Sequence, residues 1–272
     1  MKTYIYKAVA GVCSLMLLMS SCESFLSEEP KDFLSPENLP NTEAECNMLL
    51  MGSLSYWRSN NFERHINFIA EATTDAVVSA TANNVARDEM NSLTWQSDNE
   101  SLYKPWQQFY ACINASNIMI EKVPNASKVS DEVKTRYVAA ARYMRAMSYF
   151  YLVRIFNDVI YLDTPVNDFT SANNMTKTPA KEIYNKIVED LEYAEANLPV
   201  KMGFWNGTSD CRCRQSLCFH GFISRWPVNK LKDNTMWAKA ASKAKEVIDN
   251  AATYGIKLEE KLCRSLAGQQ SV

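Results

Sequence analysis

Residues 136–165 of this sequence form a predicted helix with apolar side chains on two faces. The stretch contains no glycine, and no proline before Pro165. The first stripe consists of Tyr137, Ala140, Met144, Met147, Tyr151 and Ile155, and the second of Ala139, Tyr143, Ala146, Phe150 and Val153. Because a surface helix buries one stripe only, a helix with two stripes is expected to lie between neighbouring helices.

Small side chains alternate with aromatic ones along this helix, so neighbouring helices could approach closely at some points and interlock at others. Helical hairpin solenoids stack in this way, although the core helix of any all-α protein has the same periodicity. We expect the charged ends of four arginines on this helix to stay in water: Arg136, Arg142, Arg145 and Arg154.

Composition narrows the function classes. The 272 residues include 7 glycines, where average usage would give roughly 19, which weighs against glycine-rich phosphate-binding loops and favours helices. A net charge of −2 gives no electrostatic case for binding nucleic acid. The only two histidines, His65 and His220, leave little room for Ser–His or Cys–His catalysis. No cofactor, no catalytic residue and no metal site is expected.

The N-terminus has the pattern of a targeting signal. A short basic region precedes the apolar stretch Ala8–Leu18, which is too short to span a membrane as a stable helix. The sequence Met-Ser-Ser-Cys that ends at Cys22 resembles a bacterial lipobox. We therefore expect residues 1–21 to be a lipoprotein signal peptide and Cys22 to carry the lipid, with residues 22–40 as an acylated tether and docking segment. The alternative is an ordinary secretory signal with a chance cysteine.

Residues 141–165, ARYMRAMSYFYLVRIFNDVIYLDTP, combine an Ala-Arg-aromatic-x-Arg-Ala pattern with an aromatic run and then Asn-Asp-Val-Ile. This order resembles the signature helix of the SusD/RagB family of Bacteroidetes outer-membrane lipoproteins. Asn157 stands where that family usually has glycine, and Ile160 where it has proline. Asparagine tolerates the left-handed conformation better than most non-glycine residues, so we expect the turn to be kept.

Two further segments resemble the same family. One has the pattern Trp106, Tyr110, Ile113 and Asn117, and the other has Ile183, Tyr184, Ile187, Asp190, Leu191 and Ala194. Within the first segment, Asn114 and Asn117 lie beside an apolar stripe. We expect them to have a structural role, bonding neighbouring backbone rather than ligand.

The remaining helices are predicted from caps and apolar spacing. The first begins at Asn41 or Thr42, and its expected apolar positions are Ala44, Met48, Met51, Leu54, Tyr56 and Trp57. Residues 68–76 resemble the family's second helix, which runs into Asp75. A helix over residues 103–120 is expected to hold Pro105 in its first turn, and Thr178 to cap a helix that starts at Pro179. Residues 234–255 form the last, with a stripe of Trp237, Ala240, Ala244 and Val247.

Residues 83–99 are polar and aperiodic, so we expect a loop, and long loops inside compact domains are often functional. The family resemblance implies a sugar site built partly from loops of this region, with an aromatic platform and polar neighbours. The candidate ligand-binding residues are Asp75, Arg87, Asp88, Trp95, Asp98 and Asn99. The alternative is a solvated loop with Trp95 in the core.

Two stretches, residues 203–225 and 261–272, do not fit the helical pattern. The first contains Cys211, Cys213, Cys218 and His220, and the second Cys263. The cysteine spacing is not that of a usual zinc site, and a disulfide in an exported protein is one alternative. We expect instead that both stretches are translated out of frame, so that the chain is a disrupted, truncated product of a longer gene. The helical domain would then cover residues 41–202, with a further helix fragment at 226–260.

These observations predict an all-α fold of tetratricopeptide-like stacked helical hairpins, the SusD-like α/α superhelix. The resemblance implies a non-catalytic, surface-exposed lipoprotein of the outer membrane. It would bind an oligosaccharide or polysaccharide and pass it to a SusC-like TonB-dependent transporter. Two rivals are a lipid-anchored glycoside hydrolase, for which no motif pairs the two carboxylates, and a structural helical adaptor without ligand.

Overall fold

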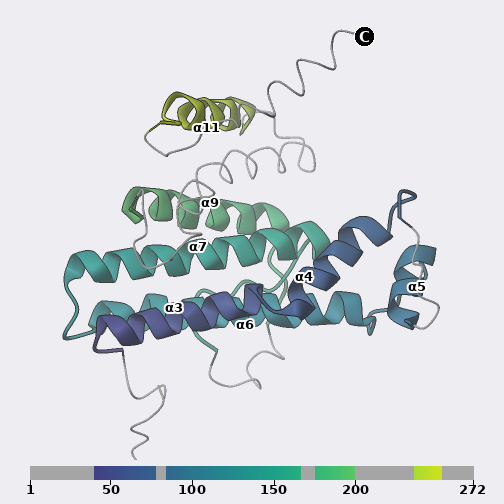
Figure 1. The fold of residues 1–272 in the computed structure, drawn as a ribbon, viewed down its shortest axis with the longest axis horizontal. Coiled ribbons are helices and arrows are strands. Elements are labelled where there is room, and N and C mark those ends of the chain that lie inside the picture. Colours follow the sequence, from purple (N-terminus) through teal and green to yellow (C-terminus); the bar gives the residue numbers. More distant parts are fainter. Residues whose placement is uncertain (1–39, 78–83, 167–174, 200–235, 253–272) are drawn as a thin grey trace, which may run out of the picture. The chain divides into compact units, whose positions relative to one another are not determined.

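The computed structural model describes residues 40–77, 84–166, 175–199 and 236–252 of the chain. Its elements are α3 (Glu43–Trp57), α4 (Asn60–Asn67), the π-helix η1 (Phe68–Ala72), α5 (Val85–Ser92), α6 (Glu100–Lys122), the 3-10 turn η2 (Val123–Asn125), α7 (Asp131–Phe156), α9 (Ala180–Asn197) and α11 (Met236–Asp249). Within the described ranges, β-structure is limited to one antiparallel bridge between Val159 and Thr178. The predicted all-α class is confirmed (Figure 1).

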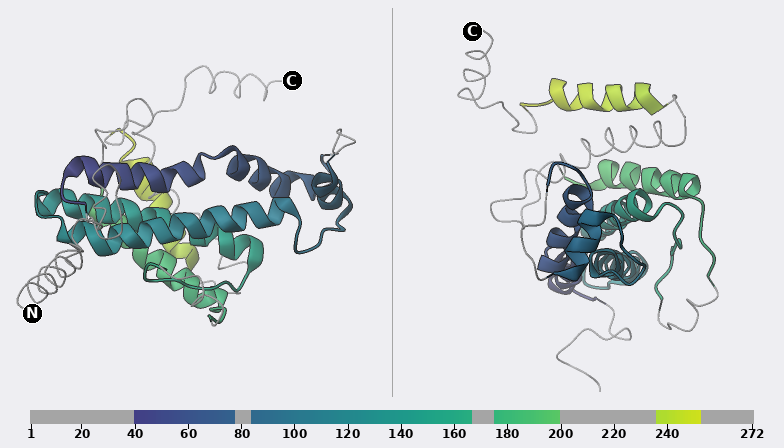
Figure 2. Two further views of the ribbon diagram at one scale, coloured as in Figure 1. Left: turned by 90° about the horizontal axis from the view of Figure 1, so that it is seen from below. Right: turned by 90° about the vertical axis from the view of Figure 1, so that its right-hand side faces the viewer.

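The long helix α7 lies between α9 and α6, as predicted from its two apolar faces (Figure 1). Tyr137 and Met144 of the first stripe are buried in a cluster with residues of α3 and α6. Phe150 and Val153 of the second stripe are buried in another cluster, which includes residues of α6 and Ile183 of α9. The right-hand view of Figure 2 shows α9 next to α7, with α6 and α3 beyond it. Both stripes are therefore in contact with neighbouring helices.

The first helix, α3, begins as predicted but buries a different face. Thr42 is its N-cap and forms a capping box with Glu45. The buried residues are Cys46, Leu50, Ser53 and Leu54, whereas the expected core residues Ala44, Met48 and Met51 are exposed. Apolar residues occur almost all round this helix, so periodicity could not choose between its faces. The prediction of its core face was wrong except at Leu54 and at the half-buried Tyr56 and Trp57.

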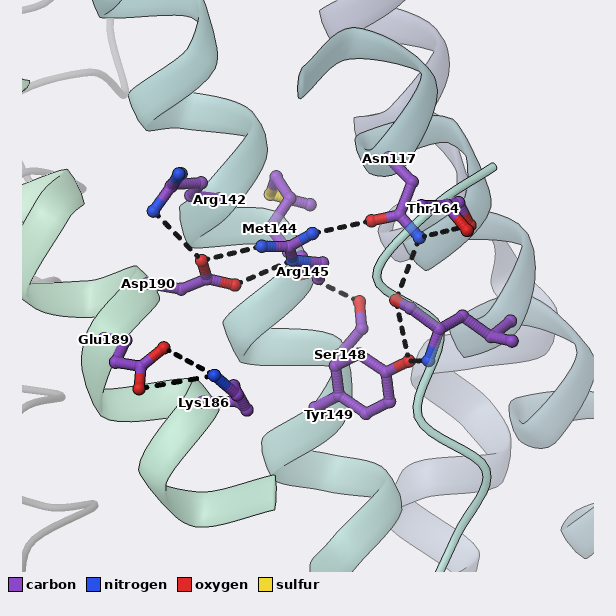
Figure 3. Close-up of polar contacts among 11 residues, drawn as sticks. Asn117, Arg142, Met144, Arg145, Ser148, Tyr149, Thr164, Lys186, Glu189 and Asp190 are labelled. Atoms are coloured by element: carbon purple, nitrogen blue, oxygen red, sulfur yellow. Dashed lines mark hydrogen bonds and ion pairs between the residues drawn. The ribbon is translucent and has the colours of Figure 1, made fainter. Parts of the chain in front are cut away.

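Arg145 contradicts the expectation that all four arginines of α7 stay in water, because it is only 7% exposed. Its Nε and Nη2 donate to the two carboxylate oxygens of Asp190 on α9, at 2.7 and 2.8 Å. Its Nη1 donates to Oδ1 of Asn117 on α6 at 2.8 Å (Figure 3). A buried charge needs a partner and hydrogen bonds. This network supplies both, and it joins α6, α7 and α9.

Asn114 and Asn117 bond the backbone of the extended segment that follows α7, which agrees with their predicted structural role. Asn117 Nδ2 donates to the carbonyl oxygens of Leu162 and Thr164 at 3.0 and 3.1 Å. Asn114 Oδ1 accepts from Val166 N at 2.8 Å. The segment over residues 160–166 is therefore fixed to α6 at several points.

The turn after α7 contains Asn157 with φ 66° and ψ −110°, so the predicted positive φ is confirmed. The next residue, Asp158, accepts a hydrogen bond from Ala180 N at 2.9 Å and so caps α9. The expected cap, Thr178, instead pairs with Val159. A carboxylate 22 residues away replaces the local cap, which spacing along the sequence could not show.

The last described helix, α11, forms within the range predicted for it. Of its expected stripe, Ala244 is exposed and Val247 half-buried, and the other two side chains lie outside the description. Cys22, the cysteines at 211, 213, 218 and 263, and residues 203–225 and 261–272 also lie outside the described residues. Across the described ranges, no helix has both the length and the apolar composition needed to cross a membrane.

Candidate functional site

The residues proposed for ligand binding lie where α4, η1, α5 and the start of α6 meet (Figure 1). Asp75 is exposed in the turn that follows η1. Asn91 of α5 holds this turn, since its Nδ2 donates to the carbonyl oxygens of Ala72 and Val77, both at 3.0 Å. The structure therefore brings the Asp75 turn and α5 together.

The prediction of a loop over residues 83–99 is wrong for residues 85–92, which form the helix α5. Asn84 caps it, accepting from Arg87 N at 3.0 Å, and Leu93 ends it in the left-handed conformation. Met90 is 1% exposed and anchors the helix to its neighbours. One buried apolar residue in two turns leaves almost no periodic signal, which explains why the sequence suggested a loop.

Arg87 and Asp88 both lie in the first turn of α5. The Arg87 guanidinium carbon lies 4.4 Å from the centre of the Phe68 ring, and that of Arg64 lies 5.7 Å from the same centre. Cation–π contacts of this kind restrict where a guanidinium can move. Asp88 is exposed, at the end of the helix where a negative charge is favoured.

Trp95 is 37% exposed, so the alternative that places it in the core is wrong. Asp98 is exposed in the same connection between α5 and α6. Asn99 differs from both, being 4% exposed. It caps α6 by accepting from Ser101 N at 2.8 Å, and its Nδ2 donates to Ala86 O and Glu89 Oε2. The Asn99 side chain thus holds α5 and α6 together and is not available to a ligand.

His65 on α4 is buried against the start of α6. It is 6% exposed, and its Nδ1 lies 3.3 Å from Ser101 Oγ on α6. Burial lowers the pKa of this histidine below its ordinary value, only partly opposed by Glu100. Glu100 is bonded to Lys104, and this hydrogen bond lowers the pKa of its carboxyl. Helix α6 begins here, so Pro105 lies in its second turn and not in the first as predicted.

The surface around these residues is acidic. Between Glu71 and Lys104 the sequence has six carboxylates and two cations. Lys104 is paired with Glu100, and Arg87 lies over Phe68. Among the described side chains, no three His, Cys, Asp or Glu residues are grouped as metal ligands would be. An exposed indole with carboxylates beside it suits a ligand that has both C–H surfaces and hydroxyl groups.

The structure also has a groove that sequence reasoning missed, between α6 and the segment 160–166, with a volume of about 640 Å³. Trp106 and Tyr110 line it, although the sequence suggested only that they belong to an apolar face of α6. A signal was present: Gln107, Ala111, Ala115 and Ile118 recur at helical spacing on a face distinct from the buried one.

Comparison with known proteins identifies the family. Residues 24–204 match a SusD-like family described as starch-binding and associating with the outer membrane. A SusD-like protein of Formosa agariphila, P2, is 30% identical over 249 residues. This match covers 90% of the present chain but 46% of the relative, so the chain spans less than half the length of that protein.

Solved structures agree on the fold. A SusD homologue from Bacteroides thetaiotaomicron superposes with a TM-score of 0.67 at 21% identity, over 79% of this chain and 42% of that one. A laminarin-binding SusD-like protein superposes with a TM-score of 0.63 at 20% identity, over 74% of this chain and 42% of that one. The family match covers most of the sequence, and the chain belongs to the SusD-like family.

Proposed function

We propose that this chain captures glycans at the cell surface for uptake, without cleaving them. The observation that carries the proposal is the exposed Trp95 in the acidic connection between α5 and α6, on a fold of the SusD-like family. A laminarin-binding protein shares this fold, which supports a glycan as the ligand class. The chain matches less than half of the length of the Formosa agariphila relative. The activity of a complete family member is therefore proposed for this chain on the basis of the family it belongs to.

The proposed contacts with the glycan include one apolar surface and several polar side chains. The face of Trp95 offers a platform for the C–H side of a sugar ring. Asp75, Asp88 and Asp98 offer carboxylates that accept hydrogen bonds from sugar hydroxyls, and Arg87 offers a donor. Asn91, Asn99 and Met90 would hold these groups in place before the ligand arrives.

The proposed location follows from the N-terminal pattern. A lipid on Cys22 would attach the protein to the outer membrane, with the helical part outside the cell. A SusC-like TonB-dependent transporter would receive the glycan. Metabolic labelling with a palmitate analogue tests the anchor: we expect incorporation that a Cys22→Ala variant loses, and incorporation that persists in the variant would contradict it.

If the protein were instead a glycoside hydrolase, it would cleave the bound glycan. A glycosidase needs two carboxyl groups held at a set separation across the scissile bond, whereas the exposed Asp75, Asp88 and Asp98 lie on three different segments. An assay for new reducing ends separates the two functions. We expect bound glycan with no release of reducing ends; release would make the protein a hydrolase.

A binding experiment tests the site. The full chain is incubated with immobilised starch, laminarin, xyloglucan and mannan, and the affinity for the best ligand is measured by calorimetry. We expect Trp95→Ala to weaken binding about tenfold or more, equivalent to about 1.4 kcal/mol. Met51→Ala, which removes an equally exposed apolar side chain from α3, is the control and should bind like the wild type. No binding to any glycan, or equal binding by Trp95→Ala, would contradict the proposal.

A further inference from the structure

The groove along α6 has features of a preformed binding site. Its volume of about 640 Å³ lies in the ~300–1,000 Å³ range of small-molecule sites. One wall is α6, and the other is the extended segment 160–166. Hydrogen bonds between its backbone and the side chains of Asn114, Asn117 and Tyr149 fix this second wall. The two walls are therefore in place without a ligand.

Aromatic rings line one end of the groove in a fixed orientation. The Trp106 ring packs edge-on against Phe156, with centroids 4.8 Å apart and planes at 90°. It also lies 4.9 Å from the Tyr110 ring. Tyr110 Oη donates to Ile160 O at 2.8 Å, which ties this ring to the opposite wall. An aromatic wall held in this way presents a defined apolar surface to the groove.

The groove is also free of charge. None of its twelve lining residues has an ionisable acid or base other than tyrosine. Its polar side chains are uncharged: the amides of Gln107 and Asn114, the hydroxyls of Tyr56 and Tyr110, and the indole N–H of Trp106. A charged ligand would lose its hydration here without gaining a partner.

We propose that this groove is a second sugar-binding subsite, which takes an uncharged oligosaccharide along α6. Aromatic rings and neutral amides match the C–H faces and hydroxyls of a neutral glycan. Laminarin, which a protein of the same fold binds, is an uncharged polysaccharide of this kind. The six carboxylates between Glu71 and Lys104 also favour an uncharged glycan, because they would repel sulfated or carboxylated chains. The inference rests on the proposed function for the ligand class only, since the groove is separate from the Trp95 surface.

Two variants of the full chain test the groove. Trp106→Ala removes the aromatic wall, and we expect the affinity for the best uncharged glycan to fall about tenfold or more. Because Trp106 also packs on Phe156, a second variant is needed that removes no contact. Ala115→Met fills the groove from a half-buried position, and Ala44→Met adds the same side chain at an exposed position on α3 as its control. We expect only Ala115→Met to weaken binding.

The outcomes separate this inference from the proposed function. If Trp95→Ala weakens binding but Trp106→Ala and Ala115→Met do not, the groove is not a subsite and the proposed function stands. If no glycan binds the wild type, the proposed function fails, and the inference fails with it. Tighter binding of alginate or pectin than of laminarin, starch or xyloglucan contradicts the uncharged ligand class. A change in sedimentation coefficient by Ala115→Met at unchanged glycan affinity would make the groove a protein interface instead.

Discussion

The two ends of this helical stack are held together by different means. Helices α6, α7 and α9 meet in an apolar cluster with the ion pair of Arg145 and Asp190 at its edge, both nearly excluded from solvent. The end formed by α4, η1 and α5 depends on side-chain amides, on a π-helix and on one buried methionine. The side chains between α6, α7 and α9 are mostly buried, whereas the α5 end has exposed polar and aromatic side chains. We therefore expect the cluster of α6, α7 and α9 to contribute more to stability than the α5 end, where the proposed binding residues lie.

The largest effect should come from breaking the buried ion pair. Asp190→Ala leaves the Arg145 guanidinium uncompensated in the core, and we expect the free energy of unfolding to fall by about 3–5 kcal/mol. Urea denaturation measures it. Lys186→Ala on the same helix is the control, because it breaks the exposed pair with Glu189 (Figure 3) and should change stability by less than ~1 kcal/mol. Equal losses in both variants would show that the buried ion pair contributes no more to stability than the exposed one.

A smaller loss of stability is expected at the α5 end. Asn99→Ala removes the cap of α6 together with the bonds to Ala86 and Glu89, which should destabilise the protein by about 1–2 kcal/mol. Asn125→Ala, at an exposed position after α6, serves as the matched control. Thermal unfolding followed by circular dichroism gives both values. A loss as large as that of Asp190→Ala would mean that the α5 end also supports the whole fold.

Asn157→Gly should act in the opposite direction. Asn157 has φ 66°, a conformation that glycine adopts more readily than asparagine. We expect a gain of about 1 kcal/mol in the free energy of unfolding, measured by urea denaturation. Unchanged or lower stability would show that the hydrogen bond from Asn157 Nδ2 to Asp158 Oδ1 outweighs the strain.

The smallest effect concerns pH. Burial lowers the pKa of His65 in the folded protein, so the unfolded chain binds a proton more readily. Stability from this residue is present above the unfolded pKa of about 6.5 and is lost as the pH falls below it. We expect the melting temperature to fall less between pH 7.5 and 5.5 in His65→Gln than in the wild type. An identical fall in both would show that His65 does not contribute.

The sequence predicted the parts of this fold that depend on repeated local patterns. The two faces of α7, the apolar stripe of α9 and the roles of Asn114 and Asn117 all follow from periodicity or motif, and each is observed. Thr42, one of the two residues expected to cap the first helix, is its N-cap.

The structural features that we did not predict from the sequence depend on contacts between residues far apart in the chain. Arg145 is buried because Asp190, 45 residues later, pairs with it. Asp158 caps α9 from another element. Helix α5 is held by Asn91, which donates to Ala72 O, and by Asn99, which donates to Ala86 O within α5. The spacing within α6 marks one wall of the groove beside Trp106, but the position of the other wall, segment 160–166, is not visible in the sequence.

Hydrogen exchange with and without ligand tests the central claim most directly, namely that the α5 end binds glycan while the α7–α9 core only supports it. The full chain is exchanged in deuterated buffer, alone and with saturating laminari-oligosaccharide, and peptides are compared by mass spectrometry. We predict added protection in peptides that cover residues 84–99, and unchanged exchange in those from α9. Protection confined to α9, or none in residues 84–99 with the ligand bound, would contradict this account.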